Sequence, residues 1–193
     1  FTYSQNAYLP CFFKTTDGGA TWTGPTMVSL NNMDTILGTP QTGYVWSMLF
    51  EFDVVLDNND NPHLLGNIYM LDPVAGQYLA GAGAFGVCDI YSNDGGTSWF
   101  GKFLSTTQTY QGVWDDNAGS TAADRTRPAL SRNAAGDKIF YVYFDTDTIA
   151  NPGSENVLPD AWCIGYDLTS GLETPLMNLT AGSLAESSVI IGN

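Results

Sequence analysis

Basic residues are scarce in this chain. Its 193 residues include 6 Lys and Arg against 20 Asp and Glu, which gives a formal net charge of −14. Six cations cannot neutralise many phosphates, so the composition argues against a nucleic-acid partner. No apolar run approaches the ~20 residues that a membrane-spanning helix needs, so we also predict no membrane span.

Histidine and cysteine, the usual ligands of zinc, are rare as well. The chain has one histidine, His63, three cysteines and no Cys-x-x-Cys motif, so we predict no zinc site. His63 follows a turn at the start of a predicted strand, and no serine or cysteine nucleophile motif accompanies it. We therefore expect a solvated or turn-packing histidine and not a catalytic base.

One segment begins like a calcium-binding loop. Asp57-x-Asn59-x-Asn61 has the spacing of the first EF-hand ligands, but Pro62 and Ile68 stand where the Gly and Glu of that motif should follow. We therefore expect a hairpin turn here. No cofactor is predicted, and Ca²⁺ held by other oxygen ligands stays an alternative.

Helix signals are poor, whereas strand signals are good. The 21 Gly and 9 Pro are spread along the chain, and residues 139–144 are an aromatic and β-branched run. Residues 52–56 and 64–71 flank a run of turn formers, which predicts an antiparallel hairpin. These strands are apolar on both faces, so we predict an all-β fold with sheets stacked face to face, as in a sandwich or propeller.

An internal repeat of about 75 residues indicates the architecture. Residues 15–22, Thr-Thr-Asp-Gly-Gly-Ala-Thr-Trp, and residues 92–99, Ser-Asn-Asp-Gly-Gly-Thr-Ser-Trp, are near copies, and a decayed third copy lies at 167–171. Each repeat contains two predicted hairpins, which makes a four-stranded unit.

The three cysteines follow the same repeat. Each cysteine lies six residues before the same position of its copy: Cys11 before Asp17, Cys88 before Asp94 and Cys163 before Thr169. Equivalent positions in successive units are too far apart for a disulfide. We therefore predict small buried core residues at all three positions.

The repeated pattern Ser/Thr-x-Asp-x-Gly-x-Thr/Ser-Trp resembles the Asp box of sialidase-like β-propellers, here of the secreted bacterial type. In that family the Asp box is the turn between the third and fourth strands of a blade. The resemblance implies structural residues, because the carboxylate accepts backbone N–H groups, glycine allows positive φ, and Trp covers the turn. These residues are Asp17, Gly19, Thr21 and Trp22 in one copy and Asp94, Gly96, Ser98 and Trp99 in the other.

The strand count then predicts a single partial propeller of about two and a half four-stranded antiparallel blades over residues 1–193. Residues 1–30 form the outer half of a blade, 51–105 and 127–180 form complete blades, and 181–193 start the loop to a missing blade. Because propellers close with at least four blades, we expect a piece of a larger secreted or cell-surface protein. The first partner that we expect for this chain is the set of remaining blades of the same propeller.

The long connections predict a ligand face opposite the Asp boxes. Residues 31–50, 71–86, 106–126, 145–161 and 181–193 are the long segments, and they carry ten of the 20 carboxylates. Long loops on a rigid scaffold commonly bind ligands, and aromatics beside carboxylates suit a glycan, a basic protein or Ca²⁺. These segments and the adjacent strand starts supply the candidates Trp46, Glu51, Trp114, Asp115, Asp116, Arg125, Arg127 and Trp162.

These features favour a secreted or cell-surface binding or scaffold module that recognises a glycan or a protein. One alternative is a sialidase-like glycoside hydrolase with most of its active site in other blades, and another is a purely structural component of a surface assembly. The resemblance would require arginines and a tyrosine–glutamate pair at the inner-strand starts, where only Glu51, Asp53 and Arg127 are found. We therefore favour a non-enzyme and assign no catalytic residue.

Overall fold

Antiparallel strands make up nearly all the regular structure of this chain. A computed structural model describes residues 9–30, 33–79, 85–109, 126–150, 152–153 and 159–181. Among these residues the one helix is a single turn, α1 (Asp34–Leu37), and every strand pairing is antiparallel. The predicted all-β class is therefore confirmed. Nothing helical in the described ranges has the length and hydropathy to cross a membrane.

The strands form a hairpin and two larger sheets. The hairpin pairs β1 (Cys11–Lys14) with β2 (Thr23–Met27). The first sheet has the order β3 (Val45–Leu56), β4 (Pro62–Asp72), β6 (Phe85–Tyr91) and β7 (Phe100–Thr106), with the short β5 (Gln77–Tyr78) paired to β4. The second sheet has the order β8 (Ala129–Arg132), β9 (Lys138–Thr146), β10 (Pro159–Asp167) and β11 (Met177–Asn178).

Both larger sheets are meanders, because strands that follow each other along the chain pair side by side. The predicted hairpin is confirmed: Val54 lies opposite Leu64, and Leu56 lies opposite Pro62. The predicted strand over 139–144 is also confirmed, as part of β9.

The prediction of a loop over residues 31–50 is wrong for its last six residues. β3 begins at Val45, and Trp46 lies opposite Met70 in register with β4. Residues 45–48 are paired with β4, with Trp46 half-buried and Met48 fully buried, so this pairing and burial make the segment a strand. The predicted loop at 71–86 is likewise shortened by the end of β4 and by β5.

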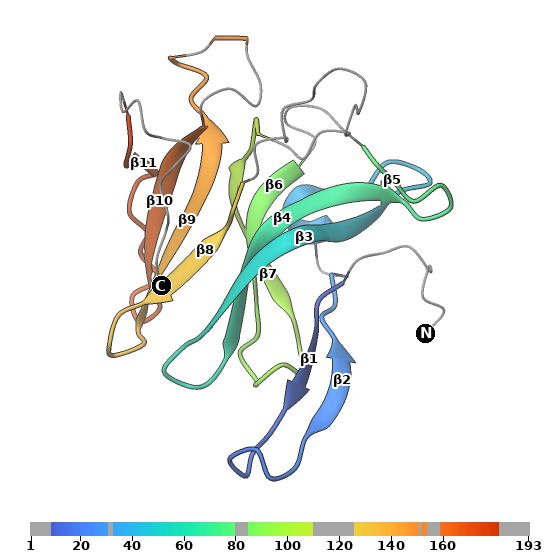
Figure 1. The fold of residues 1–193 in the computed structure, drawn as a ribbon, viewed down its shortest axis with the longest axis vertical. Coiled ribbons are helices and arrows are strands. Elements are labelled where there is room, and N and C mark those ends of the chain that lie inside the picture. Colours follow the sequence, from blue (N-terminus) through green and yellow to red (C-terminus); the bar gives the residue numbers. More distant parts are fainter. Residues whose placement is uncertain are drawn as a thin grey trace, which may run out of the picture.

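The three units are stacked in the order hairpin, first sheet, second sheet (Figure 1). Short turns at 15–22, 57–61, 92–99, 133–137 and 168–176 lie toward the lower end of that view, which we call the turn end. We call the opposite end of the strands the loop end. In the described part of the chain the stack is open and does not close into a ring.

The inner strand β4 of the first sheet is buried on both faces, since successive side chains of a strand point to opposite sides. Leu64 packs into a core with the segment that follows the hairpin, and Leu65 packs into a core with the second sheet. The first core comprises Val28, Leu30, Met33, Met48, Leu64, Ile68, Cys88, Ile90 and Trp99. The second comprises Leu65, Val87, Leu130, Ile139, Tyr141, Tyr143 and Ile164.

The cysteine prediction is right at two positions and wrong at one. Cys88 and Cys163 are buried, and all three thiols are free of disulfides. Cys11 is exposed. The hairpin accounts for the difference, because among the described residues only one of its faces is covered by a sheet.

Replacing Leu65 with Ala should destabilise the protein strongly. Leu65 is fully buried between the two larger sheets, and truncating a buried leucine costs about 2–5 kcal/mol. Val54 is 53% exposed on the neighbouring strand, so Val54→Ala should lower the free energy of unfolding by less than about 1 kcal/mol. Urea unfolding measures both, and equal losses would contradict the two-core arrangement.

Candidate functional site

The second Asp-box turn is closed by its own side chains. The Asp94 carboxylate accepts the backbone N–H groups of Thr97 at 3.0 Å and Ser98 at 2.8 Å. The Ser92 hydroxyl accepts the backbone N–H of Gly96 at 2.7 Å and donates to Asp94 at 2.8 Å. The carboxylate is thus engaged within its turn.

The first Asp-box turn repeats this arrangement. The Asp17 carboxylate accepts the backbone N–H of Thr21 at 2.9 Å, and the Thr15 hydroxyl accepts that of Gly19 at 2.8 Å. Gly19 has a φ of 93°, and Gly96 has the matching φ of 94°, a conformation that favours glycine. Both turns therefore use the same side-chain types for the same contacts.

The hydrogen bonds lower the pKa of both Asp-box carboxyl groups. The pKa of Asp17 falls from 3.8 to about 2, chiefly because Thr21 donates to its carboxylate. The pKa of Asp94 also falls to about 2, chiefly because of the backbone N–H of Ser98. Charged carboxylates are therefore part of the folded turns.

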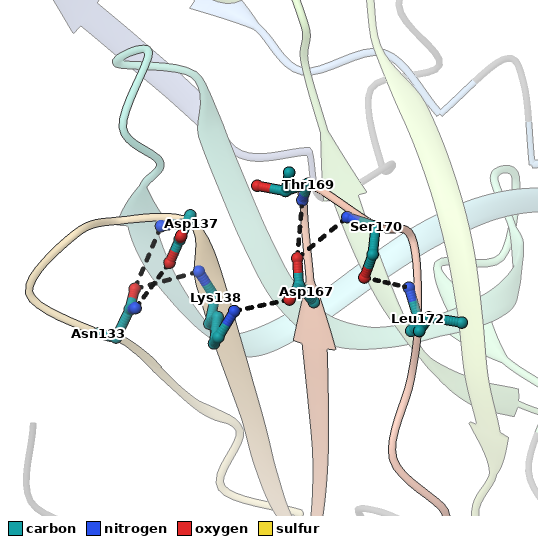
Figure 2. A network of polar contacts seen from close by, with 7 residues as sticks. All are labelled: Asn133, Asp137, Lys138, Asp167, Thr169, Ser170 and Leu172. Carbon is teal, nitrogen blue, oxygen red and sulfur yellow. Dashed lines mark hydrogen bonds and ion pairs between the residues drawn. The ribbon is translucent and has the colours of Figure 1, made fainter.

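The decayed third copy forms its turn with different side chains (Figure 2). Asp167 stands where the second copy has Ser92, and it accepts the backbone N–H groups of Thr169 at 2.9 Å and Ser170 at 3.0 Å. Lys138 pairs with the same carboxylate at 2.6 Å and lowers the pKa of Asp167 to about 2. The turn is thus held by a carboxylate that accepts backbone N–H groups, although the Asp-box residues are absent.

Arg132 joins the two larger sheets at the turn end. Its guanidinium donates to the carbonyl oxygens of Leu56 at 2.7 Å and Asp57 at 3.0 Å. The backbone N–H of Asn58 donates to the carbonyl of Gly136 at 3.0 Å. Asp57 itself accepts the backbone N–H of Asn61 at 2.8 Å, so the predicted hairpin turn is confirmed.

A cavity of about 530 Å³ opens between the two larger sheets at this end. Its lining includes His63, Asp89 and Tyr91 from the first sheet and Tyr166 from the second. Most of its lining side chains are polar. The cavity therefore offers hydrogen-bonding groups from both sheets.

A buried hydrogen-bond network forms one wall of this cavity. The carboxylate oxygen Oδ2 of Asp89 lies 2.8 Å from His63 Nδ1 and 2.8 Å from the hydroxyl of Tyr141. Because a carboxylate can only accept, His63 donates from Nδ1 and Tyr141 donates its hydroxyl proton. Burial, with the charge of Asp89, raises the pKa of Tyr141, so the phenol stays protonated.

Of the two alternatives expected for His63, solvated or turn-packing, the solvated one is wrong. His63 is buried, and its ring stacks on Tyr91 with centroids 5.5 Å apart. Its partner Asp89 lies on the adjacent strand β6, so the pairing depends on strand register. A carboxylate within the otherwise apolar run Phe85–Tyr91 was the sequence signal for this network.

Lys102 crosses from the first sheet to the second. Its ammonium lies 3.3 Å from the ring centroid of Tyr166 and pairs with Glu173. The aromatic face and the carboxylate together neutralise the cation locally. The ammonium of Lys102 is thus held at the cavity by contacts within the protein.

At the loop end, two predicted ligand residues lie on strands and pack against the cores. The indole N–H of Trp46 on β3 donates to the Gly38 carbonyl at 3.2 Å, and that of Trp162 on β10 donates to the Asp145 carbonyl at 3.0 Å. Both rings are half-buried, Trp46 against the first core and Trp162 against the second. The structure therefore does not gather them into one group.

Two other predicted ligand residues do meet at the loop end. The Glu51 carboxylate accepts the backbone N–H of Arg127 at 3.3 Å, and the side chain of Arg127 is exposed. The nearby carboxylate of Asp53 accepts the backbone N–H of Leu130 at 2.8 Å. The remaining candidates, Trp114, Asp115, Asp116 and Arg125, lie outside the described residues.

Two carboxylates of the loop end are buried and tie down the bases of the loops. Asp145 accepts the backbone N–H groups of Gln108 at 2.8 Å and Thr109 at 2.7 Å, and burial raises its pKa. Asp160 accepts the hydroxyl of Thr180 at 3.0 Å. Both carboxylates lie in predicted loop segments, and their anchoring role was not predicted.

No family model, curated protein or solved structure matches the chain. Within the described ranges, no three or more His, Cys, Asp or Glu side chains are grouped so that they could hold a metal ion.

Acid should weaken the fold through the Asp-box carboxylates. The pKa of Asp94 is about 2 in the fold against an ordinary 3.8, so between these values the unfolded chain binds the proton more tightly. The contribution of Asp94 is thus present above its unfolded pKa and is lost as the pH falls toward 2. Urea unfolding at several pH values should show a smaller acid loss for Asp94→Asn than for the unmodified protein. An identical pH dependence would contradict this role.

Proposed function

We propose that the hairpin and the two larger sheets are successive blades of an Asp-box β-propeller. Each larger sheet contains a four-stranded meander, the unit from which propellers are built around a central channel, and the first sheet adds the two-residue strand β5. The Asp-box turns follow β1 and β6, and the decayed copy follows the equivalent strand β10. The hydrogen bond from Leu130 to Asp53 joins β3 to β8, the first strands of the two sheets. Strands and turns thus occupy equivalent positions in the three units, which supports blades repeated around a common axis.

We further propose a binding or scaffold module that recognises a glycan or a protein at the loop end. The observation that carries this proposal is the difference between the two ends. The turns of the turn end are short and closed by side-chain oxygens that accept backbone N–H groups, whereas Asp145 and Asp160 anchor the bases of long segments at the loop end. Long loops on a rigid base suit recognition.

A sialidase-like hydrolase has less support. Sialidases use a tyrosine nucleophile in place of one carboxylate, so the resemblance would require arginines and a tyrosine–glutamate pair at the inner-strand starts. Glu51 accepts the backbone N–H of Arg127, and Asp53 accepts that of Leu130. Asp53 thus joins β3 to β8, and Glu51 joins β3 to the segment just before β8, which favours a structural role.

The acidic composition and the Asp-box resemblance support a secreted or cell-surface location. A net charge of −14 keeps a protein soluble and disfavours contact with other acidic surfaces. A basic protein segment or a neutral glycan is therefore the favoured class of partner at the loop end.

A glycan array and a fluorogenic sialoside panel test this proposal on the intact protein. We expect binding without hydrolysis, and we expect Arg127→Ala to weaken the binding about tenfold, because an exposed donor beside Glu51 is lost. Lys138→Ala removes an exposed cation at the turn end and is the matched control, expected to bind normally.

Two results would contradict the proposal. Hydrolysis of a sialoside that is lost in Glu51→Ala would favour the enzyme. The absence of binding to every glycan and to a basic protein such as histone would favour the purely structural component.

A further inference from the structure

The cavity at the turn end has the size of a small-molecule site and lies away from the loop end. Its volume of about 530 Å³ falls within the ordinary range of ligand pockets. Its lining includes Lys102 from the first sheet and Tyr166 and Thr169 from the second sheet and its turn. A ligand bound there would therefore contact two sheets at once.

One buried oxygen of this cavity has no partner. Asp89 is 1% exposed, and its Oδ2 accepts protons from His63 and Tyr141. Its Oδ1 has no hydrogen bond within the described ranges. A buried acceptor without a donor is costly, so a donor from a bound molecule would stabilise this wall.

His63 supplies a second acceptor on the same wall. Because Nδ1 donates its proton to Asp89, the neutral ring carries its lone pair on Nε2. Stacking on Tyr91 fixes the plane of the ring. The wall thus presents two acceptors, Asp89 Oδ1 and His63 Nε2, which suit two hydroxyl donors of one molecule.

Further groups of the cavity can both donate and accept. The side-chain amides of Asn58, Asn59 and Asn93 and the hydroxyl of Thr169 line it, and none of these side chains is hydrogen-bonded within the part of the chain that the structure describes. Amides and hydroxyls that both donate and accept match the hydroxyl groups of a polyol.

The charges of the cavity favour a neutral ligand. The carboxylate of Asp89 disfavours an anion in contact with it. Lys102 already occupies the ring face of Tyr166 and pairs with Glu173, so neither group is open to a second cation. A neutral molecule with several hydroxyl groups avoids both conflicts.

We propose that this cavity binds a neutral sugar ring. Two hydroxyls of the sugar donate to Asp89 Oδ1 and His63 Nε2, and the other hydroxyls exchange hydrogen bonds with the asparagine amides and Thr169. The site is separate from the loop end and does not depend on the function proposed there.

The imidazole of His63 provides a direct probe, since it is the one histidine of the chain. We would follow its NMR signals in the unmodified protein during titration with methyl α-glucoside, methyl β-galactoside, N-acetylglucosamine and lactose. Inorganic phosphate and propylamine represent anions and cations. At least one sugar should shift the His63 signals in a saturable way, and the two charged probes should not.

Single side-chain removals then locate the sugar. Asn93→Ala and Thr169→Ala each remove one exposed group and should weaken binding about fivefold to tenfold, the effect of one hydrogen bond. Asp89→Asn replaces an acceptor and should abolish binding. Gln77→Ala removes an exposed amide that does not line the cavity, and it should bind as the unmodified protein does.

Three results would overturn the assignment. They are no shift with any sugar, a saturable shift with phosphate or propylamine alone, and sugar binding unchanged in both Asn93→Ala and Thr169→Ala. Arg127→Ala should retain cavity binding, so a loss confined to that variant would place the sugar at the loop end instead. Because Asn93 and Thr169 are exposed, their variants stay informative even if Asp89→Asn does not fold.

Discussion

The carboxylate of Asp89 is the polar contact on which the junction between the two larger sheets depends. It accepts protons from His63 in its own sheet and from Tyr141 in the second sheet, both at 2.8 Å. A buried charge is tolerated only when its partners are well placed, so these contacts fix how Leu65 and Val87 meet the second sheet. The turn-end cavity lies beside this network, so its shape depends on how these contacts hold the two sheets together.

The same use of carboxylates recurs along the junction and gives the acidic composition a structural meaning. Asp53 accepts the backbone N–H of Leu130 at 2.8 Å, and Asp145 accepts that of Thr109 at 2.7 Å. With 6 basic residues against 20 acidic ones, most carboxylates have no cation to pair with. Backbone N–H and hydroxyl groups donate to the carboxylates instead. Some carboxylates therefore hold the sheets together, and the others remain open to ligands.

Local patterns predicted the strands and turns, whereas contacts between distant residues could not be predicted. The hairpin at 57–61 and the Asp-box turns follow from neighbouring residue types, and the start of β3 at Val45 was missed because its pairing with β4 decides it. The burial of His63 depends on Asp89, which is 26 residues away and is brought close by strand register. The exposure of Cys11 depends on which face of the hairpin is covered.

A double-mutant cycle between Asp89 and Tyr141 tests the central claim most directly. Asp89→Asn, Tyr141→Phe and the double variant are unfolded in urea, and the coupling free energy is the departure from additivity. A direct hydrogen bond between the sheets predicts a coupling of about 1–3 kcal/mol. Additivity within about 0.5 kcal/mol would show that these side chains do not join the two sheets, and would contradict the account.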